Sequence, residues 1–253
     1  MANTNDRYLT ELQRVALGAR AGLDIHTKFG RNPSVAPPED IWHGGGTYTG
    51  HPDHDADPET LTISSANAAD TAAGTGIRTL RLEGLDADWA GQSDVVTLDG
   101  TTPVTTTTTW HRMYRAYGVT AGSALSNVGD ITVRHTTTTS NVFAVIPAGF
   151  GQTQIAAYTL PAHSRGLVVR VKVGVSNSQV STQEAQTSLV TRDPGGPWRV
   201  REPVIVSTVA SAEERPLGGF VVGPRTDMKL RVLDATANNL AAVGRFDIVY
   251  VTD

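Results

Sequence analysis

Hydrophobic and polar residues alternate along most of the chain after residue 58. In residues 167–175 every odd position is Leu or Val, whereas the even positions include Arg170 and Lys172. The same period of two recurs in residues 79–83, 228–232 and 246–250. Because the side chains of a strand point alternately to its two faces, each segment is predicted to be a strand with one buried and one solvated face.

Turn signals separate these segments, among them Asp99-Gly100 and the Pro/Gly-rich stretch 193–197. The spacing predicts roughly a dozen strands and an all-β fold, an antiparallel sandwich or jelly-roll-like body. A Pro/Gly-rich break at 147–151 predicts two β layers or subdomains, 59–148 and 149–253. Two separate cores and one continuous sandwich both fit this pattern.

The first 58 residues have a different character. Apolar residues at three- and four-residue spacing predict a short helix over 5–22, with Asn5 or Asp6 as N-cap and Gly22 as its end. Residues 23–58 contain Pro, Gly and large aromatic residues without a sustained period. We therefore expect residues 1–58 to form a helix and an extended arm that docks on its own body or on a neighbour. The predicted partner-binding residues of the arm are Phe29, Trp42 and Tyr48.

Bulk composition narrows the functional classes. The chain has 253 residues, a formal net charge of −4 and no cysteine. A net acidic chain is not typical of a nucleic-acid-binding domain, and without cysteine there is neither a disulfide framework nor a thiolate metal site. No apolar run is long enough for a transmembrane helix, and the N-terminus lacks the pattern of a secretory signal. We expect a soluble protein made in the cytoplasm, with no nucleic-acid or membrane partner.

One short segment concentrates potential metal ligands. His51, Asp53, His54 and Asp55 offer imidazole and carboxylate groups, which suit a divalent cation such as zinc or manganese. Their spacing is not that of a calcium loop. A short polar linker with a few acidic residues gives the same string, so the sequence leaves both interpretations open.

Catalytic signatures are weak. No serine lies in a Gly-x-Ser-x-Gly elbow, and the glycines 44–46 have neither the preceding strand nor the lysine of a phosphate-binding loop. We expect no enzyme activity and no cofactor. Residues 110–117 interleave aromatic and basic side chains, a pattern that fits base or sugar stacking but favours a partly buried strand or a protein interface in an acidic chain.

Several stretches resemble a group of virion structural proteins from tailed bacteriophages. The resemblance covers roughly residues 28–150 and is carried by Phe29-Gly-Arg-Asn-Pro33, Pro38-Glu-Asp-Ile-Trp-His-Gly-Gly-Gly-Thr-Tyr48, residues 70–80, residues 98–107 and Gly129-Asp-Ile-Thr-Val-Arg134. It implies a structural role in the virion, assembled in the host cytoplasm, and brings no catalytic motif. The N-terminal arm and β body suit a capsid decoration (cement) protein that binds the major capsid protein or another virion protein.

The sequence leaves three functional hypotheses. The first is capsid decoration as a homo-oligomer, a trimer, because association buries exposed strand edges. The second is a neck, tail or fibre-base component with an adhesion or adaptor role. The third is a glycan-binding or glycan-cleaving receptor protein, which predicts solvent-exposed aromatic platforms around Trp110, Tyr114 or Trp198.

Overall fold

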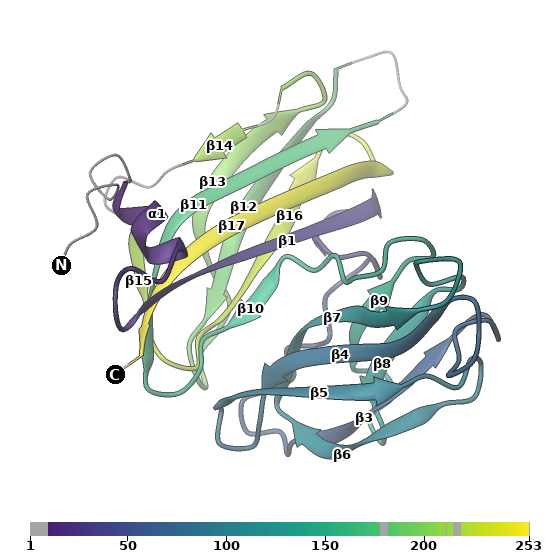
Figure 1. The fold of residues 1–253 in the computed structure, drawn as a ribbon. Coiled ribbons are helices and arrows are strands. Elements are labelled where there is room, and N and C mark those ends of the chain that lie inside the picture. Colours follow the sequence, from purple (N-terminus) through teal and green to yellow (C-terminus); the bar gives the residue numbers. More distant parts are fainter. Residues whose placement is uncertain (1–9, 178–181, 211, 215–218, 253) are drawn as a thin grey trace.

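The protein consists of two antiparallel β-sandwiches that lie side by side, as a computed structural model shows (Figure 1). The structure describes residues 10–177, 182–210, 212–214 and 219–252. In this part of the chain there are seventeen strands and one short helix. The predicted all-β sandwich fold with a short N-terminal helix is thereby confirmed.

The first sandwich packs a four-stranded sheet, in the order β6-β3-β8-β9, against a three-stranded sheet, β5-β4-β7. Its strands are β3 (Glu59–Ser65), β4 (Ile77–Leu85), β5 (Gly91–Thr97), β6 (Val104–Trp110), β7 (Arg112–Ala121), β8 (Ile131–His135) and β9 (Val142–Ile146). The inward positions of the two sheets form one hydrophobic cluster that includes Leu61, Leu82, Trp110 and Phe143, all fully buried.

The second sandwich packs the sheet β1-β17-β11-β14 against the sheet β10-β16-β12-β13; β15 also pairs with β11, and β2 with β16. Its strands are β1 (Leu23–Val35), β2 (Glu39–Asp40), β10 (Ala157–Thr159), β11 (Ser164–Ser176), β12 (Glu184–Arg192), β13 (Arg199–Ser207), β14 (Ala212–Glu214), β15 (Phe220–Val222), β16 (Asp227–Ala235) and β17 (Leu240–Thr252). A second hydrophobic cluster, separate from the first, fills the space between these sheets.

The predicted alternation holds in most strands and fails where a bulge intervenes. Phe246 and Ile248 of β17 are buried, as their pattern predicts. In β11, by contrast, the pairing with β17 shifts between Val168 and Arg170. The extra residue of this β-bulge changes the alternation in the first half of the strand, so that Val168 is buried in place of Leu167 and Val169. Beyond the bulge the odd positions are buried as predicted: Val171, Val173 and Val175.

Strand β1 was not predicted, because its inward face is polar. Residues 23–35, expected to be part of an extended arm, pair with β17 along almost their whole length. Lys28 and Asn32 are buried on this strand, whereas Phe29 is 40% exposed. A strand that buries polar side chains does not show the alternation by which strands are recognised in a sequence.

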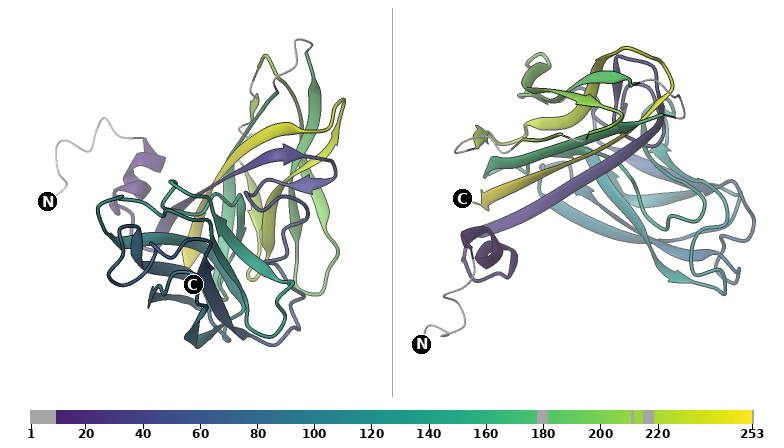
Figure 2. Two further views of the ribbon diagram at one scale, coloured as in Figure 1. Left: turned by 90° about the vertical axis from the view of Figure 1, so that its right-hand side faces the viewer. Right: turned by 90° about the horizontal axis from the view of Figure 1, so that it is seen from above.

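Helix α1 (Glu11–Ala16) is shorter than predicted. Its N-cap is Thr10, whose side chain accepts a hydrogen bond from the Gln13 amide in a capping box. The proposed caps Asn5 and Asp6 lie outside the described residues. The chain leaves the helix at Gly18, whose positive φ of 69° favours glycine. Figure 2 shows α1 near the start of β1, on the second sandwich. None of the helices that the structure describes has the length and apolarity of a membrane span.

Candidate functional site

A buried carboxylate joins the two sandwiches. Asp227, at the start of β16, has no solvent exposure. Its Oδ1 accepts a hydrogen bond from Arg112 Nε of β7 at 3.0 Å, and its Oδ2 accepts one from Arg192 NH2 of β12 at 2.6 Å. The Thr159 hydroxyl of β10 donates to Oδ1 at 2.6 Å. One aspartate thus holds groups from both sandwiches.

The charges at this junction compensate each other. Burial alone raises the pKa of Asp227, but the positive charges of His51 (when protonated), Arg112 and Arg192 outweigh it and hold the pKa below its usual value. Arg112 NH2 also donates to the carbonyl oxygen of Pro52 at 2.9 Å. The junction is therefore a compensated, hydrogen-bonded cluster of the kind in which buried charges are tolerated.

The structure separates the four residues considered as metal ligands. His51 is buried, with Nε2 3.3 Å from the Thr159 hydroxyl, and burial lowers its pKa well below the usual value. His54 Nε2 lies 2.8 Å from the carbonyl oxygen of Arg225 and 3.6 Å from Asp227 Oδ2. Asp53 and Asp55 are exposed.

The two histidines thus belong to the junction, and the two aspartates lie at the surface beside it. Within the described ranges, no three His, Cys, Asp or Glu side chains are grouped so as to hold a metal ion. Both oxygens of the nearest buried carboxylate, that of Asp227, already accept hydrogen bonds from arginines. A metal ion at residues 51–55 stays a prediction.

A second buried carboxylate fixes the segment that follows β1. Asp40 of β2 forms ion pairs with Lys229 Nζ at 2.7 Å and Arg231 Nε at 2.6 Å, and it accepts a hydrogen bond from the Tyr48 amide at 2.7 Å. Lys229 Nζ also lies 4.3 Å from the ring centroid of Trp198. Residues 40–48 are therefore held against β16 by charge as well as by packing.

Two of the three predicted partner-binding residues are buried in the protein itself. Trp42 and Tyr48 are 5% and 3% exposed, and their rings meet edge to face with centroids 5.2 Å apart. The Tyr48 hydroxyl lies 3.0 Å from the carbonyl oxygen of Phe143 and 3.2 Å from that of Met113. Segment 40–48 of the expected arm therefore docks on the chain's own body, one of the two alternatives considered.

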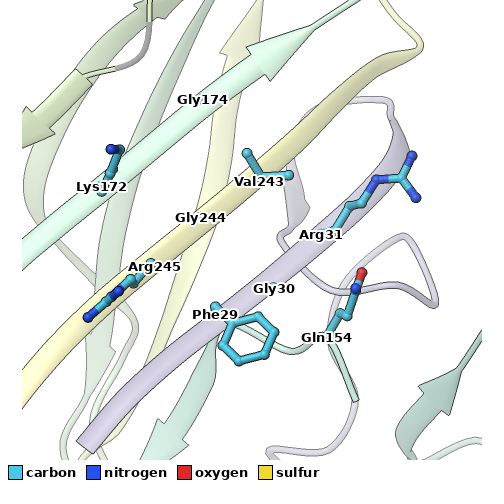
Figure 3. Close-up of a pocket in the computed structure, with 9 residues that line it drawn as sticks. All are labelled: Phe29, Gly30, Arg31, Gln154, Lys172, Gly174, Val243, Gly244 and Arg245. Carbon is cyan, nitrogen blue, oxygen red and sulfur yellow. The ribbon is translucent and has the colours of Figure 1, made fainter. Parts of the chain in front are cut away.

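Phe29, the third residue, lies on an exposed sheet face. It projects from the outer side of the sheet β1-β17-β11, beside a shallow groove of about 300 Å³ (Figure 3). Val243, 49% exposed, and Gly174, which has no side chain, form its apolar part. Arg31, Lys172 and Arg245 also line it. We call the surface formed by Phe29, Arg31, Lys172, Val243 and Arg245 the outer face.

The alternation of strand residues creates this groove. Gly30 and Gly244 are directly opposed in β1 and β17 and face inward, where Ile41 packs against them. Their neighbours in sequence, Phe29 and Val243 among them, consequently face outward. The outer face combines an apolar centre with a cationic rim, a composition suited to protein contact.

The aromatic residues considered for glycan binding are not arranged as an open platform. Trp110 is fully buried in the first sandwich. Tyr114 packs edge-on against Tyr158, with ring centroids 4.8 Å apart. Trp198 is partly exposed, but one of its faces stacks on His51 and the cations of Arg192 and Lys229 lie over its ring.

Comparisons with known proteins identify no family. No protein-family model and no curated protein matches the chain. Among solved structures, it is similar to one of the infectious bursal disease virus Gt strain, with 9% identity, a TM-score of 0.25, and 90% of this chain and 72% of that chain covered. The PBSX exported protein XepA is 9% identical, with a TM-score of 0.19, and the match covers 90% of this chain and 86% of that chain. For the T13 viral particle of infectious bursal disease virus the same four values are 9%, 0.23, 91% and 73%. Similarity at these TM-scores does not indicate a function.

Proposed function

We propose that the protein is a non-enzymatic structural component of a tailed-phage virion, a decoration protein that attaches to the outside of the capsid and stabilises the shell. The resemblance of residues 28–150 to virion structural proteins of tailed phages supports the virion role. The buried junction around Asp227 supports a structural role. Its hydrogen bonds hold the two sandwiches together, so the chain segments between them are not their only connection.

The exposure of Phe29 is the observation that supports attachment through the outer face. Trp42 and Tyr48 are engaged in the chain's own core, whereas Phe29 remains on the outer face beside Val243. Exposed aromatic side chains surrounded by arginine are typical anchors of protein interfaces. The partner is the major capsid protein or another virion protein, and its contact surface presents apolar and acidic groups to the outer face.

Self-association into a homotrimer is the second part of the proposal. Strand β13 forms the end of its sheet and carries Val200 and Ile205, which are 52% and 70% exposed. A free edge with exposed β-branched residues is a liability in a monomer and is covered in many oligomers. Light scattering at micromolar concentration tests this part, and a monomer at all concentrations contradicts it.

The attachment is tested by head binding of point variants. Deletion of residues 1–58 is unsuitable, because it removes β1 and the buried Trp42 and Tyr48. Phe29→Ser removes the aromatic side chain from the outer face, and we expect it to reduce co-sedimentation with capsids that lack the protein at least tenfold. Val95→Ser, at a residue of β5 that is 50% exposed, is the matched control and keeps full binding. Equal binding of the two variants contradicts attachment through the outer face.

A further inference from the structure

The chain has three lysines. The two that are buried, Lys28 and Lys229, differ in whether a described carboxylate lies within ion-pair distance. Lys229 is 1% exposed and forms an ion pair with Asp40, whose Oδ2 lies 2.7 Å from the lysine Nζ. Lys28 is 7% exposed and forms no ion pair with any described carboxylate within 4.0 Å. A buried ammonium group is costly without a negative partner, so the environment of Lys28 is incomplete.

Lys28 extends from β1 of the second sandwich toward β7 of the first. Its Nζ donates a hydrogen bond to the carbonyl oxygen of Tyr114 at 2.5 Å and lies 5.0 Å from the centroid of the Tyr114 ring. An ammonium group has three N–H donors, and these two contacts do not use them all. The side chain is therefore able to donate to a further acceptor.

A cavity of about 210 Å³ lies beside Lys28, between the two sandwiches. Arg115 of β7 contributes a second cation, and Gln152 and Thr153 add polar groups from the loop before β10. The Thr153 hydroxyl oxygen accepts a hydrogen bond from the Ala116 amide at 3.2 Å, so its own hydrogen is free to point elsewhere. The cavity thus presents several donors to its interior.

The one acidic residue that lines this cavity is engaged elsewhere. Glu83 lies 3.6 Å from Arg115 NH1 and 3.7 Å from Arg81 Nε, and it accepts a hydrogen bond from the Tyr117 hydroxyl at 3.2 Å. Lys28 and Arg115 together with Glu83 leave one uncompensated positive charge when Lys28 is protonated. A monoanion balances that charge, whereas a dianionic phosphate overcompensates it next to Glu83.

We propose that this cavity is a carboxylate-binding site, in which Lys28 and Arg115 receive a single carboxylate from a small organic acid or from an aspartate or glutamate of a partner protein. The Lys28 ammonium then gains the ion pair that Lys229 already has with Asp40. Phe29 of the outer face also lines this cavity, which lies between β1 and the first sandwich. The existence of the site does not depend on the proposed decoration role.

The charge state of Lys28 provides the readout. Burial, reinforced by Arg115 and opposed by Glu83, lowers the pKa of Lys28 to about 7. His26 on the same strand and the phenol of Tyr114 are the other titratable groups that line the cavity. A carboxylate within ion-pair distance raises the pKa of a lysine by about one unit or more.

The experiment follows the lysine side chains of the intact protein by NMR. In protein labelled with ¹³C and ¹⁵N at lysine, the three side chains give three sets of signals. Acetate and a blocked peptide with a single glutamate are each titrated against chloride at constant ionic strength. We expect saturable shifts and a raised pKa for Lys28, with Lys229 and Lys172 unchanged. A preference for acetate identifies a free acid as the ligand, and a preference for the peptide identifies a partner's side chain.

Two outcomes overturn the proposal. The first is that neither acetate nor the peptide shifts the Lys28 signals beyond what chloride does. The second is that Lys172, on the outer face, responds as strongly as Lys28, because this indicates general ion binding. Lys28→Met serves as a second variant: it keeps the stem of the side chain, and acetate binding measured by calorimetry is lost if the site is real.

Discussion

Arg112 of the first sandwich and Asp227 of the second form an ion pair from which water is excluded, with Nε and Oδ1 3.0 Å apart. The two side chains are 1% and 0% exposed. The pair lies between the two hydrophobic clusters and joins a strand of the first sandwich to a strand of the second. The first prediction concerns this coupling.

Replacement of the shared carboxylate destabilises the whole molecule. Asp227→Asn leaves Arg112 buried without a negative partner and leaves Arg192 with only the exposed Asp53, 3.2 Å from its NH1. We expect a loss of about 3–5 kcal/mol in the free energy of unfolding. Asp193→Asn is the control, because Asp193 forms a largely exposed pair with Arg199 at 3.0 Å. For this variant we expect a loss of ~0–1 kcal/mol. Urea unfolding at pH 7.5 measures both, and equal losses contradict the role given to Asp227.

The Tyr48 hydroxyl contributes to stability and not to attachment. Tyr48→Phe removes the donor that faces the carbonyl oxygens of Met113 and Phe143, at a cost of about 1 kcal/mol or slightly more. Tyr117→Phe, whose hydroxyl bonds Glu83 in a half-buried position, is the control with the smaller expected loss. Capsid binding of Tyr48→Phe stays at the wild-type level. Reduced binding without reduced stability would instead return Tyr48 to the contact surface.

Gly30 is required for the close approach of three segments. A Cβ at this position overlaps the carbonyl oxygen of Ile41 and the amide of Ala156. Gly30→Ala therefore forces the backbone apart, and we expect a loss of ~2 kcal/mol or more. Gly91→Ala is the matched control, because a Cβ at Gly91 meets no atom within 4 Å. Thermal unfolding of the two variants distinguishes the sites, and equal midpoints contradict the close approach of Gly30 to Ile41 and Ala156.

Stability decreases on acidification from about pH 6.5. Burial lowers the pKa of His51 well below 6.5, so the unfolded chain binds this proton more readily than the folded one. The stability associated with neutral His51 is complete above pH 6.5 and is lost progressively as the pH falls toward the lower folded pKa. His51→Phe preserves ring packing with Tyr48 and Trp198 and removes the titration.

Urea unfolding at pH 7.5, 6.5 and 5.5 tests this dependence. We expect the wild-type protein to lose more stability between pH 7.5 and 5.5 than His51→Phe does. Part of the pH dependence of stability remains in the variant, because burial also lowers the pKa values of His26 and His135. Identical slopes in the two proteins contradict a buried neutral His51.

The sequence was sufficient to predict most strands of the two sandwiches, because their inward positions are hydrophobic. It was insufficient for β1, whose buried Lys28 and Asn32 depend on partners far along the chain, such as Tyr114. Nor did it predict the burial of Val168 in β11, because one bulge residue shifts the alternation in the first half of that strand. The alternation of hydrophobic and polar residues predicts which positions are buried only where the buried side chains are apolar.

The junction was only partly accessible from the sequence. The segment 110–117 was recognised as aromatic and basic, and the interpretation as a partly buried strand agrees with the burial of Arg112. Asp227, which pairs with Arg112, and Arg192, which shares that carboxylate, lie 80 residues or more beyond Arg112, and no local pattern connects them. The sequence indicates His51 and His54 as candidate metal ligands, whereas in the fold they line the junction.

A reconstruction of the intact virion tests the central claim most directly. The proposed decoration role predicts density for both sandwiches at many icosahedral positions on the outer shell, with Phe29 and the outer face directed toward the capsid. Density in a single ring or in a few copies at the neck or tail contradicts decoration and favours the adaptor role. Absence of the chain from the purified particle contradicts a virion role altogether.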